Sequence, residues 1–394
     1  MDLQLPFDVN PFDRLADLVR GVPVPDGVTP LRMCLGEPQL PPPELIATTL
    51  QANERAWNRY PPTSGELAYR QACVRWLNRR YRLPSDYLDP DRHILSLSGT
   101  KEGLFLIAQV AVGPERRSPA RVVLIPSPYY LVYDGAARMA GAETVYLRTS
   151  EASGHLPDLD GIDASILRRT ALAYLCSPSN PQGAVASLEY LEKYIQLART
   201  FDFILVVDEC YSEIYDEAPP PGALEACVRL GEGLRNVLIF NSLSKRSNAG
   251  GLRCGFVAGD ERIIEAFRRL RSFSGGQVPI PIQLAGAALW DDDEHVEINR
   301  RHYRCNFEIA AAVLGDAFEL RRPAASFFLW LNVGDGEAAA LKLWRKAGIR
   351  VLPGAYLTPS TPDDPDPAAS HIRVALVHDP ATVEMGLRAL RRLL

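Results

Sequence analysis

The sequence predicts an α/β protein with a large domain built on a mostly parallel sheet and a smaller α+β domain. Short apolar runs alternate with helical patterns through the middle of the chain, which is typical of βαβ units. One run, residues 203–208, is apolar up to its final carboxylate and is therefore expected to be a strand buried on both faces. The C-terminal third mixes strand and helix patterns. We expect residues 45–280 to form the large domain, and residues 1–44 with 281–394 to form the small one.

Individual elements follow from the residue patterns. Apolar runs that stop at a proline, serine or other polar residue predict strands, and in the large domain these runs are residues 94–97, 121–125, 171–176, 203–208 and 237–240. Apolar residues at helical spacing predict a helix between Leu188 and Ala198. In the small domain the same reasoning predicts strands at residues 327–331, 349–352 and 372–377, and helices at residues 338–347 and 382–393.

Composition excludes several classes of protein. The net charge of −5, with 47% hydrophobic and 23% charged residues, describes an ordinary globular protein without the basic footprint of a nucleic-acid-binding protein. No apolar run approaches the roughly 20 residues of a membrane helix. The seven cysteines are dispersed and form no C-x-x-C pair, and no secretory signal is visible. We therefore expect a cytoplasmic protein with reduced thiols and no metal site.

Lys245 is the first candidate catalytic residue. It is one of only five lysines among the 43 lysines and arginines of the chain, and it follows an expected buried strand and two hydroxyls, Ser242 and Ser244. Arginine cannot lose its proton to form an imine, whereas lysine can when its surroundings lower its pKa. Lys245 is therefore a candidate Schiff-base residue. The alternative is an ordinary lysine in a surface loop.

Asp208 is the second candidate, because it ends the most apolar strand at the edge where parallel sheets bind their ligands. A buried carboxylate needs a charged partner. The pyridinium nitrogen of pyridoxal phosphate would suit it, because a carboxylate keeps that nitrogen protonated and the ring electron-withdrawing. Tyr211, three residues later, could donate to the phenolic oxygen of the same ring. The alternative is that Asp208 only caps a following helix.

Residues 98–103 form a candidate phosphate site. The segment joins an expected strand to an apolar helix through small residues, and the free N–H groups and dipole of such a helix start attract a phosphate. Ser242 and Arg253, on either side of Lys245, could bring a hydroxyl and a guanidinium to the same phosphate. Considered alone, residues 98–103 could also be an ordinary capped helix start.

Two further candidates follow expected strands. Tyr130 lies just past residues 121–125 and could stack on a flat ring, although core packing would equally account for an aromatic residue there. Asn180 follows residues 171–176 and could reach an oxygen on the same ring. As part of a Pro-rich turn, Asn180 needs no function at all.

Taken together, these motifs resemble the class I and II aminotransferases of pyridoxal-phosphate fold type I, from about residue 30 to the C-terminus. That resemblance implies a seven-stranded, mostly parallel sheet in the large domain. Nine pieces stand in the order typical of the family: Gly36-Glu37-Pro38, Tyr60 with Gly65, Gly99-Thr100-Lys101-Glu102, Tyr130, Asn180-Pro181-x-Gly183, Asp208-Glu209-x-Tyr211, Ser242-x-Ser244-Lys245, Arg253 and Arg373. Residues 242–248, 254–260, 351–354 and 373–377 are more narrowly similar to N-succinyldiaminopimelate aminotransferases. Gly250 departs from the family pattern, which has proline there.

The resemblance implies a role for each residue. Lys245 would hold the cofactor as a Schiff base and act as general acid and base, while Asp208 holds the pyridinium proton. Tyr211 and Asn180 would bind the ring oxygen and Tyr130 would stack on the ring. The cofactor phosphate would be bound by Gly99, Thr100, Lys101, Ser242 and Arg253, with Tyr60 reaching in from a second subunit of a homodimer. Ser244 would also bind the cofactor.

Substrate binding would fall to Arg373, Asn180 and the Gly36 segment. Arg373 would hold the substrate α-carboxylate in a bidentate pair, unless it is an exposed strand arginine. A donor for a second, distal carboxylate is expected among four arginines between which the sequence does not decide, Arg14, Arg32, Arg70 and Arg271.

The resemblance therefore implies an aminotransferase that uses glutamate and N-succinyl-2-amino-6-ketopimelate in lysine and diaminopimelate biosynthesis. One alternative is an aminotransferase for aspartate, alanine, aromatic amino acids or acyl-ornithine. A pyridoxal-phosphate-dependent β-lyase or α-synthase would need the same Lys245, Asp208 and Arg373. A cofactor-binding transcription regulator would also need a DNA-binding domain, and no basic winged-helix pattern precedes the motifs.

Overall fold

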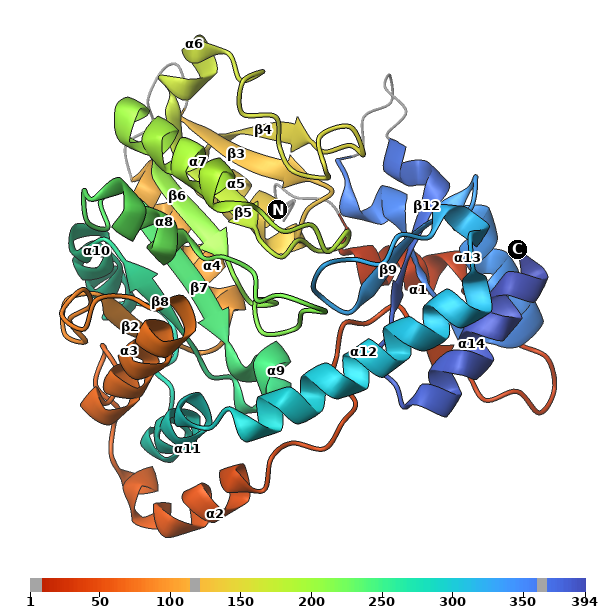
Figure 1. Cartoon of the computed structure of the whole chain (residues 1–394), viewed down its shortest axis with the longest axis horizontal. Helices are drawn as coiled ribbons and strands as arrows, with labels where there is room; N and C mark the ends of the chain where they lie inside the picture. The colour runs from red at the N-terminus through yellow and green to blue at the C-terminus, as the bar shows by residue number, and fades with distance from the viewer. Residues whose placement is uncertain (1–8, 114–120, 360–366) are drawn as a thin grey trace, which may run out of the picture.

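The computed structural model describes residues 9–113, 121–359 and 367–394. Figure 1 shows a larger and a smaller part, with the long helix α12 (Glu294–Leu314) running from one to the other. The larger part contains a seven-stranded sheet, and the smaller part contains a three-stranded sheet flanked by helices. The predicted α/β fold with a large, mostly parallel seven-stranded sheet is confirmed. Within the described residues, no helix combines the length and apolar character that crossing a membrane requires.

The large sheet has the strand order β2-β8-β7-β6-β5-β3-β4. Four of its neighbouring pairs are parallel, and β8 alone runs antiparallel to its neighbours β2 and β7. The strands are β2 (Ile94–Leu97), β3 (Val122–Ser127), β4 (Glu143–Arg148), β5 (Thr170–Cys176), β6 (Ile204–Asp208), β7 (Val237–Ser242) and β8 (Gly255–Gly259). All five strands predicted for this part are present, with ends that differ by one or two residues.

Helices cover both faces of the large sheet. One face packs against α3 (Leu67–Tyr81), α7 (Leu188–Phe201), α8 (Ala223–Leu230) and α11 (Ile280–Asp291). The other packs against α4 (Thr100–Val112), α5 (Leu131–Met139) and α10 (Glu261–Arg271). Along β6, Leu205 and Val207 enter the first layer and Val206 enters the second. Both faces of β6 are therefore buried, as its uninterrupted apolar run predicts.

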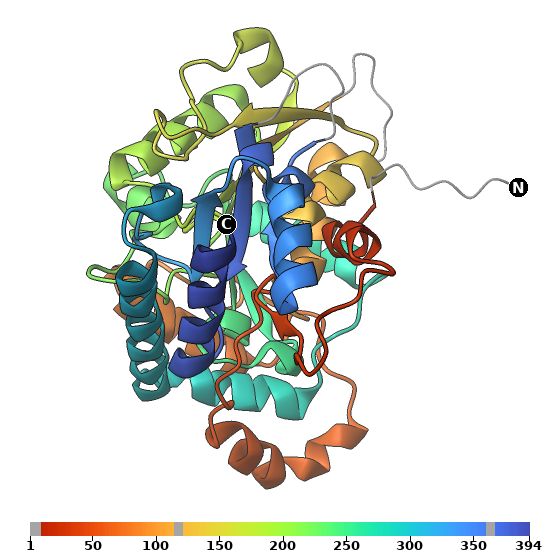
Figure 2. The same cartoon turned by 90° about the vertical axis from the view of Figure 1, so that its right-hand side faces the viewer.

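The smaller part is built on the antiparallel strands β11-β12-β9, with a separate parallel pair of β1 and β10. Figure 2 shows α12 and α14 side by side on its outer surface. Its elements are α1 (Pro11–Leu18), β1 (Leu31–Arg32), β9 (Phe328–Asn332), α13 (Gly336–Ala347), β10 (Ile349–Arg350), β11 (Leu352–Pro353), β12 (His371–Ala375) and α14 (Pro380–Leu393).

One predicted strand is divided in two. Residues 349–352 are expected as a single strand, but Ile349 pairs with Leu31 of β1, whereas Leu352 pairs with Arg373 of β12. The chain changes partners at the fully buried Val351. Residue pattern alone predicts an extended conformation and does not say which strand will be the partner.

The strand order brings three of the predicted motifs to one edge. β5, β6 and β7 are parallel neighbours that end at Cys176, Asp208 and Ser242, and Cys176 lies directly opposite Asp208 in the register. The segments that follow these ends carry Asn180, Tyr211 and Lys245. They meet the small sheet, where Arg373 on β12 donates to Asn180. This is the carboxyl edge at which open parallel sheets bind ligands.

Candidate active site

A cavity of about 460 Å³ lies between the carboxyl edge of the large sheet and the small part. It is lined by eight of the residues predicted from the sequence: Gly36, Tyr130, Asn180, Tyr211, Ser244, Lys245, Arg253 and Arg373. Asp208 lies behind this wall, with only 5% of its surface exposed. Gly99, Thr100, Lys101, Ser242 and Tyr60 do not line the cavity.

Lys245 reaches the cavity from the short helix α9 (Leu243–Arg246), which begins directly after β7. The Ser242 side chain caps this helix by accepting a 3.1 Å hydrogen bond from Ser244 N, which fixes where the next residue points. Lys245 Nζ donates to the Gly36 carbonyl and has no ion pair within the described residues. Burial lowers the pKa of Lys245 to about 8, and the positive charges of Arg373 and Arg253 act in the same direction. The surface-lysine alternative is therefore wrong.

Asp208 is a buried carboxylate whose hydrogen-bond donors are neutral. Tyr133 Oη donates to Oδ2 over 2.8 Å, and Cys210 N donates to Oδ1 over 3.2 Å. Burial raises the pKa of Asp208, and these donors partly offset that effect. The helix-cap alternative does not apply, because residues 210–213 form turns and no helix begins there. Among the described residues Asp208 therefore has no ion pair with the kind of cation that a buried carboxylate requires.

The predicted phosphate site is a cluster around Arg253. Gly99 has a φ of +73° and precedes α4, and a Cβ at this position would overlap the Arg253 guanidinium, so only glycine fits. Arg253 Nη2 donates to Ser98 O over 3.2 Å, and Nη1 donates to Gly250 O over 3.0 Å. Arg253 has no acidic partner among the described residues. A guanidinium without a counter-ion beside a helix start is a site for an anion.

The other residues predicted to bind the cofactor at this site are two serines, Thr100 and Lys101. The Ser242 and Ser244 hydroxyls lie 2.9 Å apart, and the Thr100 hydroxyl lies 3.2 Å from the Cys210 thiol. Lys101 is exposed on the first turn of α4. Its backbone N–H is among the free donors of the helix start, whereas Lys101 does not line the cavity.

Arg373 is the buried cation of the small sheet. It lies on β12 with 4% of its surface exposed, so it is not an exposed strand arginine. Nη1 donates to Asn180 Oδ1 over 2.8 Å, Nη2 donates to Cys34 O over 2.7 Å, and the guanidinium stacks 4.3 Å from the Phe328 ring centre. Burial lowers the pKa of Arg373 to about 10, so it stays cationic at neutral pH. Its buried Nε has no hydrogen-bond partner in the part of the chain that the structure describes, which leaves a donor for a carboxylate ligand.

Two tyrosines complete the cavity wall. Tyr130 stands directly before α5, and its ring meets the Tyr133 ring edge-on, with centres 5.7 Å apart. Tyr211 is buried against Phe327 and Phe328, with ring centres 5.5 and 5.9 Å away. Both side chains have one side on the core and the other on the cavity. The core-packing alternative and the stacking prediction for Tyr130 are therefore compatible.

The structure adds wall residues that the sequence does not indicate. The first turn of α1 contributes Pro11 and Phe12, and the small part contributes Phe328 and Leu357. Tyr133 is a further addition, because it contacts Asp208 from behind the cavity. Its spacing of three residues from Tyr130 at a helix start is the one local signal that could have indicated it.

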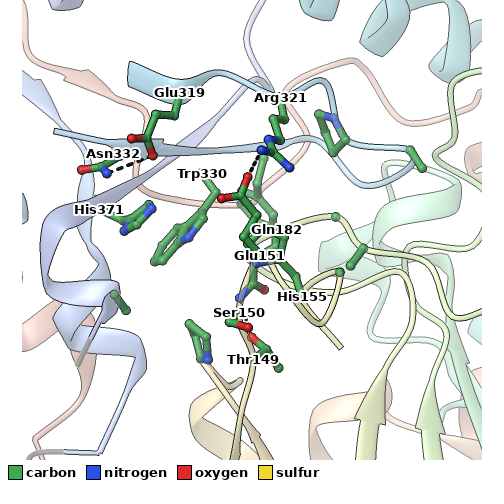
Figure 3. Close-up of a pocket in the computed structure, with 18 of the residues that line it drawn as sticks. Thr149, Ser150, Glu151, His155, Gln182, Glu319, Arg321, Trp330, Asn332 and His371 are labelled. Atoms are coloured by element: carbon green, nitrogen blue, oxygen red, sulfur yellow. Dashed lines mark hydrogen bonds and ion pairs between the residues drawn. The ribbon is translucent and has the colours of Figure 1, made fainter. Parts of the chain in front are cut away.

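A second cavity of about 360 Å³ lies beside the first, and Phe328 lines both of them. Figure 3 shows its interior, with an ion pair between Glu151 and Arg321 across the gap. The Trp330 and His371 rings stack in parallel, 4.9 Å apart. None of the predicted site residues lines this cavity.

Comparison with known proteins agrees with the geometry. The family model of aminotransferase class I and II matches residues 29–390. An LL-diaminopimelate aminotransferase of Moorella thermoacetica is 32% identical over 93% of this chain and 92% of its own length. The crystal structure of an aminotransferase from Neisseria meningitidis has a TM-score of 0.93 and 38% identity over 99% of this chain and 98% of its own. A probable N-succinyldiaminopimelate aminotransferase from Thermus thermophilus has a TM-score of 0.85 and 27% identity, over 98% and 100% of the two chains.

The chain belongs to the class I and II aminotransferases. The cofactor of this family is pyridoxal 5′-phosphate, and three features of the structure fit it. Within the described ranges, Asp208 is a buried carboxylate without a paired cation, and Arg253 with Gly99 forms an anion site without an acid. Lys245 is an amine of lowered pKa at the wall of the cavity. These are the partners required by a pyridinium nitrogen, a phosphate and an aldehyde, respectively.

Proposed function

We propose that this aminotransferase moves an amino group between glutamate or 2-oxoglutarate and N-succinyl-2-amino-6-ketopimelate, in lysine and diaminopimelate biosynthesis. The observation that carries the proposal is that a half-buried amine, Lys245, and a buried guanidinium, Arg373, face one cavity. The local resemblance of residues 242–248 and 254–260, and the likeness to the Thermus thermophilus protein, support the N-succinyl substrate. The unpaired state of all seven cysteines supports a cytoplasmic location.

The proposed roles follow from the contacts. Arg373 binds the substrate α-carboxylate with the donors that its bonds to Asn180 and Cys34 leave free, and Asn180 orients the guanidinium. Bound pyridoxal phosphate supplies a ring that withdraws electrons from the substrate Cα. Lys245 Nζ accepts the proton from that carbon and returns it, because a pKa of about 8 leaves part of the amine neutral at physiological pH. Asp208 holds a proton at the ring nitrogen, and Tyr211 and Asn180 donate to the ring oxygen.

Gly36 would close this arrangement over the substrate. Its carbonyl accepts from Lys245 Nζ, and a Cβ at this position would overlap the Phe328 ring. The absence of a side chain lets the segment lie directly on Phe328, next to Arg373. The proposed phosphate ligands are the helix start at Gly99, Thr100 and Lys101 together with Ser242, Ser244 and Arg253.

The four arginines considered for the distal carboxylate do not line the cavity. Arg70 donates to Gly65 O, Pro90 O and Asp91, and Arg271 donates to Ser96 O and pairs with Glu102. Arg32 is exposed, and Arg14 stacks on the Tyr356 ring. Among the described residues of a single chain, the cations of the cavity wall are Lys245, Arg253 and Arg373. A distal donor would therefore come from a second subunit or from closure of the cavity.

One observation favours a second candidate, direct transamination of LL-diaminopimelate. Glu37 is an acid on the cavity wall and makes no ion pair within the described residues. An acid suits the free distal ammonium of LL-diaminopimelate better than a succinyl carboxylate. The relative from Moorella thermoacetica carries the name of that activity.

A substrate panel separates the two candidates. We expect N-succinyl-LL-diaminopimelate, assayed with 2-oxoglutarate, to exceed alanine, aspartate and tyrosine in kcat/KM by at least about 100-fold, because a distal group that is missing leaves a buried partner unpaired. It should also exceed LL-diaminopimelate. A reversed order of these two amino acids would select the second candidate, and equal turnover of alanine, aspartate or tyrosine would leave only a general aminotransferase. A β-lyase would instead release pyruvate or a similar keto acid without 2-oxoglutarate.

We also propose a homodimer in which Tyr60 completes the partner's phosphate site. Tyr60 is fully exposed, and so is most of the Phe273 side chain. The segment that follows Tyr60 contacts β2, because Ser64 O accepts a hydrogen bond from Ser96 N. The segment that follows Phe273 contacts the residue after β2, because Gly276 O accepts from Ser98 Oγ. Exposed aromatic side chains on two adjoining segments are typical of an interface.

Subunit mixing tests this arrangement. Lys245→Ala and Tyr60→Ala chains should each be nearly inactive, while refolding them together should restore about a quarter of wild-type activity, because half of the dimers would then hold one intact site. Lys245→Ala with Arg253→Ala is the matched control: both residues line the cavity of one chain, so a mixed dimer of these two variants contains no intact site and should stay inactive. A fully active monomer at micromolar concentration would contradict the shared site.

A further inference from the structure

Tyr133 connects the core of the large part to the proposed ring-nitrogen partner. It lies on α5 with no exposed surface, and its hydroxyl donates to Asp208 Oδ2 over 2.8 Å. It does not line the catalytic cavity. Tyr133 therefore does not contact a ligand in that cavity, and its hydrogen bond to the site is the one to Asp208.

Two aromatic rings hold the Tyr133 ring in place. Tyr174 stacks on it with ring centres 4.5 Å apart and an angle of 12°, and Tyr130 meets it edge-on at 5.7 Å and 88°. Tyr174 is itself fixed by a 2.7 Å hydrogen bond to Leu104 O. The position of the Tyr133 hydroxyl is thus set by packing, and the direction in which Asp208 receives its hydrogen bond is set with it.

Tyr133 remains the donor in its hydrogen bond to Asp208 at every working pH. Burial, together with the charge of Asp208, raises the pKa of Tyr133 well above its ordinary value, so the hydroxyl remains a neutral donor. A neutral donor stabilises the ionised carboxylate without adding a positive charge that would repel a pyridinium. The Cys210 N–H, which also donates to Asp208, is likewise neutral.

We propose that Tyr133 is a positioning residue that keeps Asp208 ionised and oriented through a neutral hydrogen bond, so that the proton shared with the cofactor ring resides on the ring nitrogen. The inference rests on the proposed role of Asp208. Without the Tyr133 hydroxyl, the buried carboxylate becomes a stronger base and draws that proton towards itself. The ring then withdraws electrons less strongly, and proton removal at the substrate Cα slows.

Tyr133→Phe tests the proposal, with Tyr174→Phe as a matched control. Both tyrosines are fully buried, stack on each other and lose one hydrogen-bonding hydroxyl, but only Tyr133 contacts Asp208. In Tyr133→Phe we expect kcat to fall about tenfold, with KM for the amino donor changed less than about twofold, since a hydrogen bond to a charged group is worth roughly this factor. Tyr174→Phe should stay close to wild type in both constants.

Two readouts are independent of turnover. In the apo-protein, difference infrared spectra of the carboxyl stretch should show the pKa of Asp208 raised by roughly one unit in Tyr133→Phe only. In the holoenzyme, the ¹⁵N resonance of ring-labelled cofactor should shift towards the unprotonated position in that variant only. Both measurements need no amino-acid substrate, so they can be evaluated even if the proposed substrate is wrong.

Several outcomes would overturn the inference. An unchanged infrared titration and an unchanged ¹⁵N shift in Tyr133→Phe would reduce Tyr133 to a packing residue, and so would equal effects in both variants. Urea unfolding of the two apo-variants measures whether the substitutions differ in their effect on stability. We expect matching unfolding midpoints, because each variant loses one buried hydroxyl. If wild-type holoenzyme itself shows an unprotonated ring nitrogen, the proposed role of Asp208 fails, and the inference fails with it.

Discussion

Arg373 Nη1 donates a 2.8 Å hydrogen bond to Asn180 Oδ1, and this bond joins β12 of the small sheet to the loop after β5 of the large sheet. The two residues are 193 positions apart in the sequence. Both line the 460 Å³ cavity. A carboxylate bound at Arg373 would therefore rest against both parts of the molecule, which couples substrate binding to their relative position.

Arg373→Lys should lower kcat/KM by about 100-fold. A lysine keeps the charge but loses the planar set of donors that contacts Asn180, Cys34 O and a carboxylate together. Steady-state kinetics with saturating 2-oxoglutarate measure the loss. Arg271→Lys is the control, because it replaces another buried arginine that does not line the cavity. An equal loss in both variants would show a general loss of stability rather than a substrate contact.

Lys245→Ala should abolish transamination, since no other lysine lines the cavity. In the wild-type holoenzyme, borohydride reduction should bleach the visible absorbance and leave the cofactor attached to the peptide that contains Lys245, as mass spectrometry can show. Lys346→Ala, at an exposed position on α13, is the matched control and should behave as wild type. Appreciable turnover by Lys245→Ala would disprove the proposed mechanism.

Capture of the cofactor by the apo-protein should depend on pH with a midpoint near 8. The neutral amine of Lys245 is the nucleophile, and burial lowers its pKa from 10.5 to about 8. Below pH 8 the capture rate should rise about tenfold per pH unit, and above pH 8 it should level off. Stopped-flow absorbance gives the rate, and cofactor binding by Lys245→Ala corrects for titration of the phosphate. A midpoint near 10 would mean that the amine is not buried in solution.

Asp208→Ala should retain part of its cofactor affinity but lose most of its rate. The phosphate site around Arg253 and Gly99 is unchanged by the substitution, whereas the ring nitrogen loses the carboxylate that keeps it protonated. Equilibrium dialysis measures the affinity, and single-turnover absorbance with an amino donor measures the chemical step. Near-normal turnover would leave Asp208 with a structural role only.

Local sequence predicted the parts of this protein whose physical cause is local. An uninterrupted apolar run ending in a carboxylate predicts β6 and Asp208, because a strand buried on both faces needs no polar positions. The chemistry restricts the residue type in the same way: only lysine supplies an amine at position 245, and only arginine supplies the planar donors at position 373. These residues could therefore be predicted before any contact was known.

The partners of those residues were decided by the tertiary structure alone. Tyr133 and Asp208 are 75 positions apart, and Lys245 and Gly36 are 209 apart, so no helical or strand period relates them. The antiparallel placement of β8 between β2 and β7, and the change of partner at Val351, likewise depend on which edges are free when the sheets assemble. The sequence determined which groups the chain could use. Packing determined which groups face each other, and burial at those contacts set their charge, including the pKa of about 8 at Lys245.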